Sequence, residues 1–190
     1  MPQLGYTAAD VQVLCPMLKG DVGTRNLNQV LQHIVNPPSP HKAEIIRGGI
    51  KFRVGDRILQ QRNDYTHEVF NGDLGVVTAI DTDELELTAQ FGDRQVTYDH
   101  TDPEEIALAF ATTIHKSQGS EYPVVILPVF RQHFTMLSRN LLYTGVTRAR
   151  KLVILIGSQG SIRLAIDQVK DQQRHTLLAH RLQQTFGLSD

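Results

Sequence analysis

The sequence TTIHKSQGSEYP occupies residues 112–123, and the apolar run Val124 to Val129 follows it directly. Hydroxyl side chains, a histidine and one glycine therefore stand just before a segment that has the composition of a buried strand. A second stretch, LLYTGVTRARK at residues 141–151, places two arginines and two threonines beside helix-forming residues. These two stretches hold the side chains best suited to chemistry, and the remaining sequence has the patterns of a scaffold around them.

Composition sets the broad class of the protein. The chain has 190 residues, of which 41% are hydrophobic and 21% charged, as in ordinary soluble globular proteins. Such a length can bury one or two modest cores. The formal net charge is -1, so no general positive field attracts nucleic acid, and any DNA contact has to come from a local arrangement of donors.

Cysteine usage and hydropathy indicate the compartment. The single Cys15 cannot form an internal disulfide, and its strand-like neighbours suggest a small buried hydrophobic residue in a reducing compartment. The amino terminus has no signal-peptide pattern, and no apolar run approaches the ~20 residues that span a bilayer. We therefore expect a cytoplasmic protein without a membrane contact.

The first part of the chain has an α/β pattern. A strand is expected at residues 11–15, and a glycine-containing loop leads to a helix with Thr24 as its N-cap, running to about Val35. Apolar residues recur at helical spacing and predict the buried face of this helix: Leu27, Val30, Leu31 and Ile34. A strand, a glycine loop and a helix start can present backbone N–H groups to a phosphate, but the pattern is equally that of an ordinary connection.

The middle of the chain changes to a period of two residues. Leu85, Leu87, Ala89 and Phe91 alternate with polar residues, Gly92-Asp93 predicts a turn, and the alternation returns through Tyr98. This is the pattern of a β-hairpin with one apolar face. Residues 47–103 are accordingly predicted to form a small antiparallel β-barrel, inserted between two segments of α/β character, 1–46 and 104–190.

The α/β pattern resumes after Pro103. We expect buried strands at 106–111, 124–129 and 152–156, and a turn with a short helix at 113–119. Further helices are expected at 140–149, 161–168 and 175–186. Strands that are continuous runs of Val, Ile and Leu between helices predict a parallel sheet covered on both faces.

The first chemical stretch has residues suited to binding a phosphate group and a sugar. Thr113 and His115 follow a predicted strand, at the carboxyl edge where open α/β sheets bind ligands. A hydroxyl, an imidazole and backbone amides can hold a phosphate oxygen, and Gly119 permits close approach of the backbone. Glu121 is placed to accept a hydrogen bond from a ribose hydroxyl. Taken singly, His115 could equally be a surface side chain and Glu121 a solvated carboxylate.

The second stretch adds Arg148. An arginine beside a phosphoryl-transfer site stabilises the developing charge and can contribute ~10³–10⁵ in rate. The alternative is a surface arginine in a basic patch at a helix end, where cations are favoured in any case. Composition alone does not decide between the two interpretations.

The residues of the two stretches and their spacing resemble motifs V and VI of superfamily-one helicases. The version HKSQGSE at residues 115–121 is most similar to the RecD-like branch, the family of the exodeoxyribonuclease V alpha subunit. Residues 16–32 resemble the segment that this family places before its insertion, and residues 54–75 resemble its small barrel of the Src-homology-three type. The likeness covers roughly residues 8–160.

The resemblance implies a role for each matching position. Thr113, His115 and Ser117 would contact single-stranded DNA, together with residues of two other loops: Lys19, Gly20, Asp64 and Tyr65. Gln118 and Gly119 would couple the DNA site to the nucleotide site, and Glu121 would bind the nucleotide sugar. Arg148 would be the arginine finger, supported by Tyr143 and Thr147. Members of the family translocate 5′→3′ along DNA and use ATP and Mg²⁺.

One part of the family's pattern is absent from the sequence. The chain contains no Gly-Lys dipeptide and hence no phosphate loop of the G-x-x-x-x-G-K-[ST] type. Asp81 and Glu84 follow a predicted barrel strand, and we interpret them as turn residues. ATP and Mg²⁺ would therefore be bound mainly by a first RecA-like motor domain, and this chain would be the second one, inactive alone.

Partners and alternatives follow from this interpretation. The expected partners are single-stranded DNA, the first motor domain and other exodeoxyribonuclease V subunits. A helicase of the conjugative relaxase or Pif type shares the architecture, and a non-catalytic module that binds single-stranded DNA or a protein partner is the alternative from another class. The histidines are scattered, His175 and His180 included, so no metal site is expected.

Overall fold

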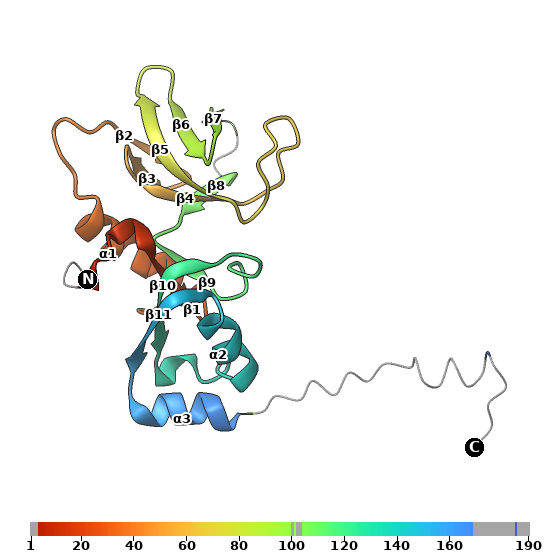
Figure 1. The fold of residues 1–190 in the computed structure, drawn as a ribbon. Helices are drawn as coiled ribbons and strands as arrows, with labels where there is room; N and C mark the ends of the chain where they lie inside the picture. Colours follow the sequence, from red (N-terminus) through yellow and green to blue (C-terminus); the bar gives the residue numbers. More distant parts are fainter. Residues whose placement is uncertain (1–3, 100, 102–103, 169–184, 186–190) are drawn as a thin grey trace.

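A computed structural model describes residues 4–99, 101, 104–168 and 185. Two units lie one above the other in Figure 1, with a parallel α/β unit below and an antiparallel β unit above. The chain begins in the α/β unit, passes through the β unit and returns, as predicted for an insertion.

The α/β unit is built on a four-stranded parallel sheet. Its strands are β1 (Val11–Cys15), β9 (Ala111–Thr113), β10 (Tyr122–Val129) and β11 (Ala149–Gly157), in the order β11-β10-β1-β9. In the register of the sheet, Val13 lies beside both Ala111 and Ile126. The predicted parallel sheet is confirmed.

Helices cover both faces of this sheet. Alternate side chains of a strand point to opposite faces, so Leu14 packs toward α2 (Arg139–Val146) and α3 (Gln159–Asp167). Its neighbours Val13 and Cys15 pack on the other face, against α1 (Thr24–Val35). Burial raises the pKa of the Cys15 thiol to about 12, so this cysteine behaves as a small hydrophobic residue.

The expectation for α1 was wrong in two respects. Gly23 is the N-cap and Thr24 the first helical residue. The fully buried positions are polar, namely Thr24, Asn28 and Gln32. Of the predicted apolar face, Leu27 and Leu31 are partly buried against the core, whereas Val30 is 44% and Ile34 is 68% exposed. Asn28 shows why: its Oδ1 accepts from the Ala111 N–H at 2.8 Å, and its Nδ2 donates to the Ala111 carbonyl at 2.9 Å. Because β9 is an edge strand, this side chain satisfies backbone groups that the sheet leaves unpaired.

Over the described residues, the β unit contains seven strands. They are β2 (Glu44–Arg47), β3 (Ile50–Arg53), β4 (Arg57–Gln60), β5 (Leu74–Asp81), β6 (Glu86–Phe91), β7 (Arg94–Tyr98) and β8 (Ile106–Leu108). Five form an antiparallel sheet in the order β7-β6-β5-β4-β8, and β2 pairs with β3. The predicted hairpin is present, with Leu87 opposite Tyr98 and Ala89 opposite Val96. Antiparallel pairing thus runs from Glu44 to Leu108.

The predicted strand at 106–111 is two strands in different sheets. Ile106–Leu108 pairs antiparallel with β4, and Ala111–Thr113 pairs parallel with β1. Between them, the Gln12 Nε2 group lies 3.2 Å from the Ala109 carbonyl and 3.4 Å from the Phe110 carbonyl. An apolar run can satisfy either sheet, so hydrophobicity alone could not locate this crossing.

Other boundaries differ from the predicted ones by a few residues. The short helix expected at 113–119 is a series of turns, and α2 ends at Val146, not Ala149. Helix α3 begins at Gln159 because the Ser158 hydroxyl accepts from the Ser161 N–H and caps it. The terminal helix expected at 175–186 lies outside the described residues except for Thr185. None of the described helices is long and apolar enough to cross a membrane.

His133 gives the fold a predicted dependence on pH. The short 3-10 helix η3 (Arg131–His133) buries this imidazole completely, and its Nδ1 accepts from the Phe130 N–H at 3.4 Å. Burial lowers the pKa of His133 below its ordinary 6.5, so the unfolded chain binds the proton more tightly. The stability contribution of the neutral ring is therefore complete above pH 6.5 and declines as the pH falls from 6.5 toward the folded pKa.

We expect the free energy of unfolding to fall, below pH 6.5, by up to about 1.4 kcal/mol per pH unit more in the wild type than in His133→Gln. Urea unfolding followed by circular dichroism between pH 5 and pH 8 measures this difference. The difference between the two proteins isolates His133, because the other histidines are present in both. Identical pH profiles would contradict the conclusion that the buried, neutral His133 ring makes stability depend on pH.

Candidate functional site

The candidate site is formed around the loop that joins β9 to β10. The loop is braced internally, because the Thr113 Oγ1 accepts from the Lys116 N–H at 3.2 Å and the Ser117 N–H donates to the Thr113 carbonyl. Gly119 has a φ of +88°, a conformation that favours glycine. The side chains of His115 and Gln118 are exposed. The loop is thus a preformed turn that directs polar groups outward.

Ser117 is placed differently from the other residues of this loop. It is 1% exposed, and its hydroxyl donates to the Ile114 carbonyl at 2.8 Å. A hydroxyl in this position holds the turn and does not face solvent. The expectation of a direct DNA contact from Ser117 therefore has no support in the geometry of the loop.

The loop runs from the carboxyl end of β9 to the amino end of β10, at opposite ends of the parallel strands. Thr113 ends β9 at the level of Cys15, and β10 reaches the same level near Pro128. Tyr122 begins β10, six residues before Pro128. At about 3.3 Å per residue, the Glu121 end of the loop therefore lies roughly 20 Å from the level of Thr113 along the strand direction. Thr113 and Glu121 consequently mark two separate places that one short segment joins.

Arg148 lies at the Glu121 end of this loop, in the turn between α2 and β11. Its guanidinium donates to the Thr144 carbonyl at 3.2 Å, and to the Ser120 carbonyl and the Thr147 hydroxyl at 3.3 Å each. All three acceptors are neutral, so these bonds orient the group without cancelling its charge. Arg148 itself is half-buried. The arrangement is an oriented cation at the molecular surface.

Glu121 pairs with a residue that the sequence analysis did not select. The Arg150 Nε donates to the Glu121 Oε2 at 2.8 Å, and the two side chains are 63% and 53% exposed. An exposed ion pair contributes little stability, so it can open for a ligand at small cost. The sequence offered one indication of this pair: Arg148 and Arg150 alternate with Ala149 at the start of a strand, which places both arginines on one face. Tyr143 is 71% exposed on α2.

The loop after β1 contains Lys19 and Gly20, both exposed. Gly20 has a φ of +92°, and a Cβ on Gly23 would lie 2.3 Å from the Lys19 carbonyl oxygen, so both turns require glycine. The N–H groups of Thr24 and Arg25 already donate to carbonyls of this same loop. The structure therefore favours an ordinary strand-to-helix connection over a phosphate site built from these amides.

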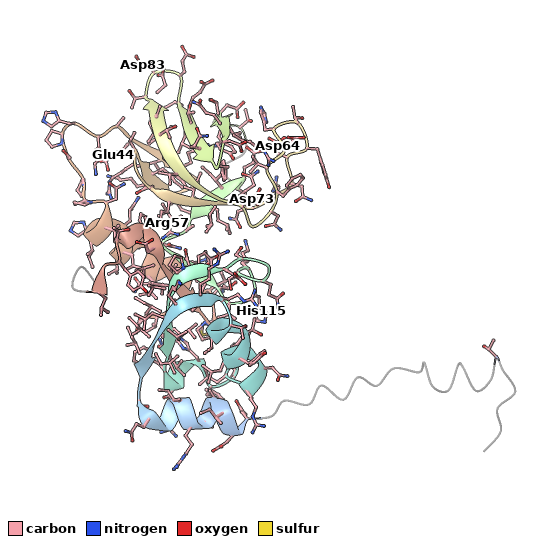
Figure 2. All side chains as sticks on the ribbon, in the orientation of Figure 1. Glu44, Arg57, Asp64, Asp73, Asp83 and His115 are labelled. Atoms are coloured by element: carbon pink, nitrogen blue, oxygen red, sulfur yellow. The ribbon has the colours of Figure 1, made fainter. Side chains whose placement is uncertain are left out.

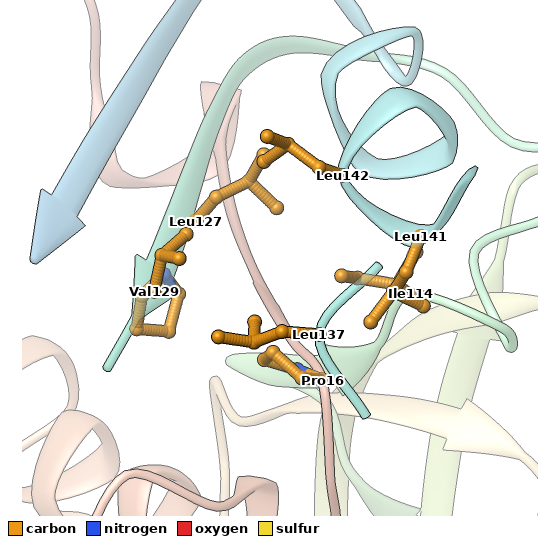
Figure 3. A pocket seen from close by; sticks show the side chains of 8 residues that line it. Pro16, Ile114, Leu127, Val129, Leu137, Leu141 and Leu142 are labelled. Atoms are coloured by element: carbon orange, nitrogen blue, oxygen red, sulfur yellow. The ribbon is translucent and has the colours of Figure 1, made fainter. Parts of the chain in front are cut away.

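These loops share an apolar base. Pro16 and Ile114 follow β1 and β9, and they line a small pocket with residues of β10 and α2. Figure 3 shows Leu127 facing Leu141 and Leu142 across that pocket. Its lining is apolar, so it supports the loops and provides no polar recognition.

The barrel contacts the α/β unit at the motif loop and at β1. The Lys116 ammonium donates to the Gln61 Oε1 at 2.6 Å, which joins the motif loop to the end of β4. Arg57 of β4 donates to the Val11 carbonyl at 2.7 Å and to the Gln12 Oε1 at 2.9 Å. His115 projects on the side of the molecule where the barrel loop containing Asp64 also projects (Figure 2). That loop carries Asp64 and Tyr65, so the structure brings two of the expected contact regions to one side.

The fold defines a class of protein. Solved structures of Pif1 helicase from Bacteroides match 96% of this chain and 46% of theirs with a TM-score of 0.61 at 19% identity, in a complex with ADP-AlF3 and single-stranded DNA. The single-stranded DNA complex of Bacteroides Pif1 matches with a TM-score of 0.55 at 17% identity, over 93% of this chain and 45% of the other. At these identities the likeness establishes the fold alone, a parallel α/β unit with an inserted antiparallel β unit.

Sequence comparison identifies the family. Residues 27–91 match the SH3 domain of ATP-dependent RecD-like DNA helicases, and residues 108–156 match the UvrD-like helicase C-terminal domain. The ATP-dependent RecD2 DNA helicase of Deinococcus radiodurans is 36% identical over 95% of this chain and 24% of its own length. The RecBCD enzyme subunit RecD of Mycolicibacterium smegmatis is 32% identical over 85% of this chain and 28% of its own. The chain belongs to the RecD-like helicases and corresponds to their C-terminal region, about a quarter of the length of these relatives.

Proposed function

We propose that this chain acts as the second motor domain of an ATP-dependent 5′→3′ DNA helicase. In this proposal, Thr113 and His115 contact the backbone of single-stranded DNA, and Glu121 contacts the sugar of the nucleotide. Arg148 is the arginine finger. The single observation that carries the proposal is the loop of residues 114–121, because one braced segment joins these two places about 20 Å apart.

The coupling role follows from the shape of this loop. Gln118 and Gly119 lie between the DNA end and the nucleotide end, and Gly119 has the freedom to change conformation at small cost. A shift at Ser120, whose carbonyl accepts from Arg148, would be transmitted to Thr113 through the turn hydrogen bonds. We propose Lys19, Gly20, Asp64 and Tyr65 as further DNA contacts on neighbouring loops.

The nucleotide would be shared with a partner domain. Arg148 offers an oriented charge for phosphate oxygens, which fits one side of a nucleotide. The sequence contains no phosphate loop, so a first motor domain would hold Mg²⁺ and most of the ATP, and Mg²⁺ would neutralise charge on the phosphates. Some relatives are named as subunits of the RecBCD enzyme. Further subunits of exodeoxyribonuclease V are therefore candidate partners, testable by co-purification.

The DNA contacts are tested by fluorescence anisotropy of labelled single-stranded DNA over a salt series. We expect the wild type to bind weakly, with an affinity that falls as salt increases, because phosphate contacts release counterions. Thr113→Ala/His115→Ala should weaken binding about tenfold, since two hydrogen bonds are lost.

A matched control replaces an exposed threonine and an exposed histidine elsewhere, as Thr82→Ala/His33→Ala. This variant should bind as the wild type does, and circular dichroism should show all three proteins folded. Equal affinity of the wild type and the Thr113/His115 variant would contradict the placement of the DNA contacts.

A further inference from the structure

The Glu121 carboxylate is held at one oxygen and open at the other. The Arg150 Nε donates to its Oε2 at 2.8 Å, and within the part of the chain that the structure describes no other hydrogen bond or ion pair reaches this carboxylate. Its Oε1 therefore keeps the capacity to accept a hydrogen bond. The Glu121 and Arg150 side chains are 53% and 63% exposed, so a ligand can approach that oxygen from solvent.

The backbone of β11 is irregular at Arg150. In the parallel pairing of β10 with β11, Tyr122 lies beside Ala149 and Val124 lies beside Leu152. Two steps along β10 thus correspond to three steps along β11, which means that β11 holds one extra residue in this interval. A bulge of this kind changes the direction of a side chain and occurs often next to functional sites. The irregularity includes the residue that pairs with Glu121.

Pro123 gives this irregularity a cause in the sequence. It is the β10 residue between Tyr122 and Val124, and a proline has no N–H to donate to the neighbouring strand. Because β10 lies inside the sheet, between β11 and β1, a proline is tolerated there only near the start of the strand or at a bulge. The segment from Glu121 to Pro123 therefore contains both the carboxylate and the residue that disturbs the strand carrying its partner.

The charges at this end of the loop are divided between two arginines. Neutral oxygens, the Ser120 carbonyl and the Thr147 hydroxyl, hold the Arg148 guanidinium at 3.3 Å each, whereas Arg150 holds Glu121. The carboxylate consequently does not cancel the charge of Arg148. The positive charge of Arg150 also reduces the repulsion between Glu121 and an anionic ligand. Since an exposed ion pair contributes little to stability, its value to the protein lies in this arrangement and not in folding.

We propose that Arg150 is a positioning residue for the nucleotide sugar. It holds Glu121 through Oε2, so that Oε1 accepts a hydrogen bond from a sugar hydroxyl without first having to be ordered by the nucleotide. This inference rests on the proposed function, in which Glu121 contacts that sugar. It adds a residue that acts through Glu121, and it predicts that Arg150 affects the choice between nucleotides with and without sugar hydroxyls.

The pairing itself is tested on this chain by the NMR signal of the Arg150 Nε–H group. Glu121→Ala should shift this signal and speed its exchange with water, because the group loses its acceptor. Arg163, exposed on α3, provides a reference signal that should not change. An unchanged Arg150 signal would overturn the pairing and, with it, the positioning role.

The positioning role is tested by isothermal titration calorimetry with ADP and 2′,3′-dideoxy-ADP, on a polypeptide that carries both motor domains. The wild type should bind ADP about tenfold more tightly, the factor expected for one hydrogen bond to a charged group. Arg150→Ala should reduce this ratio about threefold, because ADP must then order the Glu121 side chain itself. The control is Lys151→Ala, which removes the next cation along β11, also exposed, and should leave the ratio unchanged. The two variants should have equal affinities for 2′,3′-dideoxy-ADP.

Two further variants separate positioning from a general effect of charge. Arg150→Lys should recover most of the ratio, since an ammonium group can still pair with the carboxylate. Glu121→Ala removes the acceptor and should bring the ratio to about one. Adding Arg150→Ala to Glu121→Ala should change the ratio no further, because the two residues act on the sugar through one contact.

The outcomes distinguish the positioning role from the proposed function. A normal ratio in Arg150→Ala, or equal losses of affinity for the two nucleotides, overturns the positioning role, while a loss of the ratio in Glu121→Ala still supports the sugar contact. A normal ratio in Glu121→Ala overturns the sugar contact and the positioning role together. A wild type that binds both nucleotides equally also overturns both.

Discussion

Replacing Arg148 by alanine is expected to lower DNA-stimulated ATP hydrolysis by ~10³-fold or more in a polypeptide that carries both motor domains. The reason is the state of its charge. Carbonyl and hydroxyl oxygens hold the guanidinium at 3.2–3.3 Å without neutralising it, so in the proposed role its positive charge would be available to the phosphates in the transition state. A steady-state ATPase assay with saturating single-stranded DNA measures this effect.

Two variants sharpen the Arg148 test. Arg148→Lys keeps the charge but loses the planar fork that its three acceptors orient, and we expect it to recover little of the rate. Arg150→Ala removes a neighbouring arginine whose charge is already paired with Glu121 at 2.8 Å, and its effect should be far smaller. If Arg150→Ala were the more damaging of the two alanine variants, the roles of the two arginines would have to be exchanged.

The periodicities of the sequence predicted the larger features of the fold. Continuous apolar runs predicted the parallel strands, and alternation predicted the hairpin in which Leu87 faces Tyr98. Both signals succeed because they report how many faces of a strand are buried. The same signal failed at 106–111, where Ile106 belongs to the barrel and Ala111 to the parallel sheet. Burial is equal in the two sheets, so the pattern contains no information about the crossing.

Helix α1 shows a different kind of limit. Its apolar residues at helical spacing predicted a conventional buried face, and Leu27 and Leu31 do pack partly against the core. Two of the fully buried side chains, however, are amides that bond to backbone far away in sequence. Asn28 reaches Ala111, and Gln32 reaches the carbonyl of Lys51 at 2.9 Å. Amide side chains are ordinarily exposed, and only a knowledge of their partners reveals otherwise.

The candidate site was predicted in outline but not in its contacts. The motif stretches placed Thr113 and Glu121 at the two ends of one loop, because the first follows a predicted strand and the second precedes the next one. Arg148 precedes a further strand of the same parallel sheet and therefore lies at the Glu121 end. The sequence did not reveal which side chains contact each other across long stretches of chain. Two examples are the Lys116–Gln61 hydrogen bond and the Glu121–Arg150 ion pair. Both depend on how the barrel or the turn after α2 is oriented, which local sequence does not specify.

The same amide-rich face of α1 leads to the largest expected effect on stability, at Asp56. This carboxylate is fully buried in the turn between β3 and β4. Its Oδ1 accepts from the Asn36 amide at 2.7 Å, and its Oδ2 accepts from the Gln32 amide and from the Arg53 N–H at 2.7 Å. Burial raises the pKa of Asp56, while these donors act in the opposite direction and favour the carboxylate. The side chain joins the end of α1 to the barrel.

Asp56→Ala should lower the free energy of unfolding by about 3–5 kcal/mol, because three buried N–H groups each lose the carboxylate as acceptor, at about 1–3 kcal/mol each. Relaxation recovers part of this cost, since the Gln32 and Asn36 amide nitrogens keep one bond each, to the carbonyls of Lys51 and Val54. Urea unfolding followed by circular dichroism measures the loss. The matched control is Asp81→Ala, whose carboxylate accepts from the Asp83 and Glu84 N–H groups in an exposed turn. Water can replace those bonds, so its loss should stay near 1 kcal/mol or below. Equal losses in the two variants would mean that the Asp56 cluster does not secure the barrel to the helix. A loss confined to Asp56→Ala would show that this buried carboxylate stabilises the connection between α1 and the barrel.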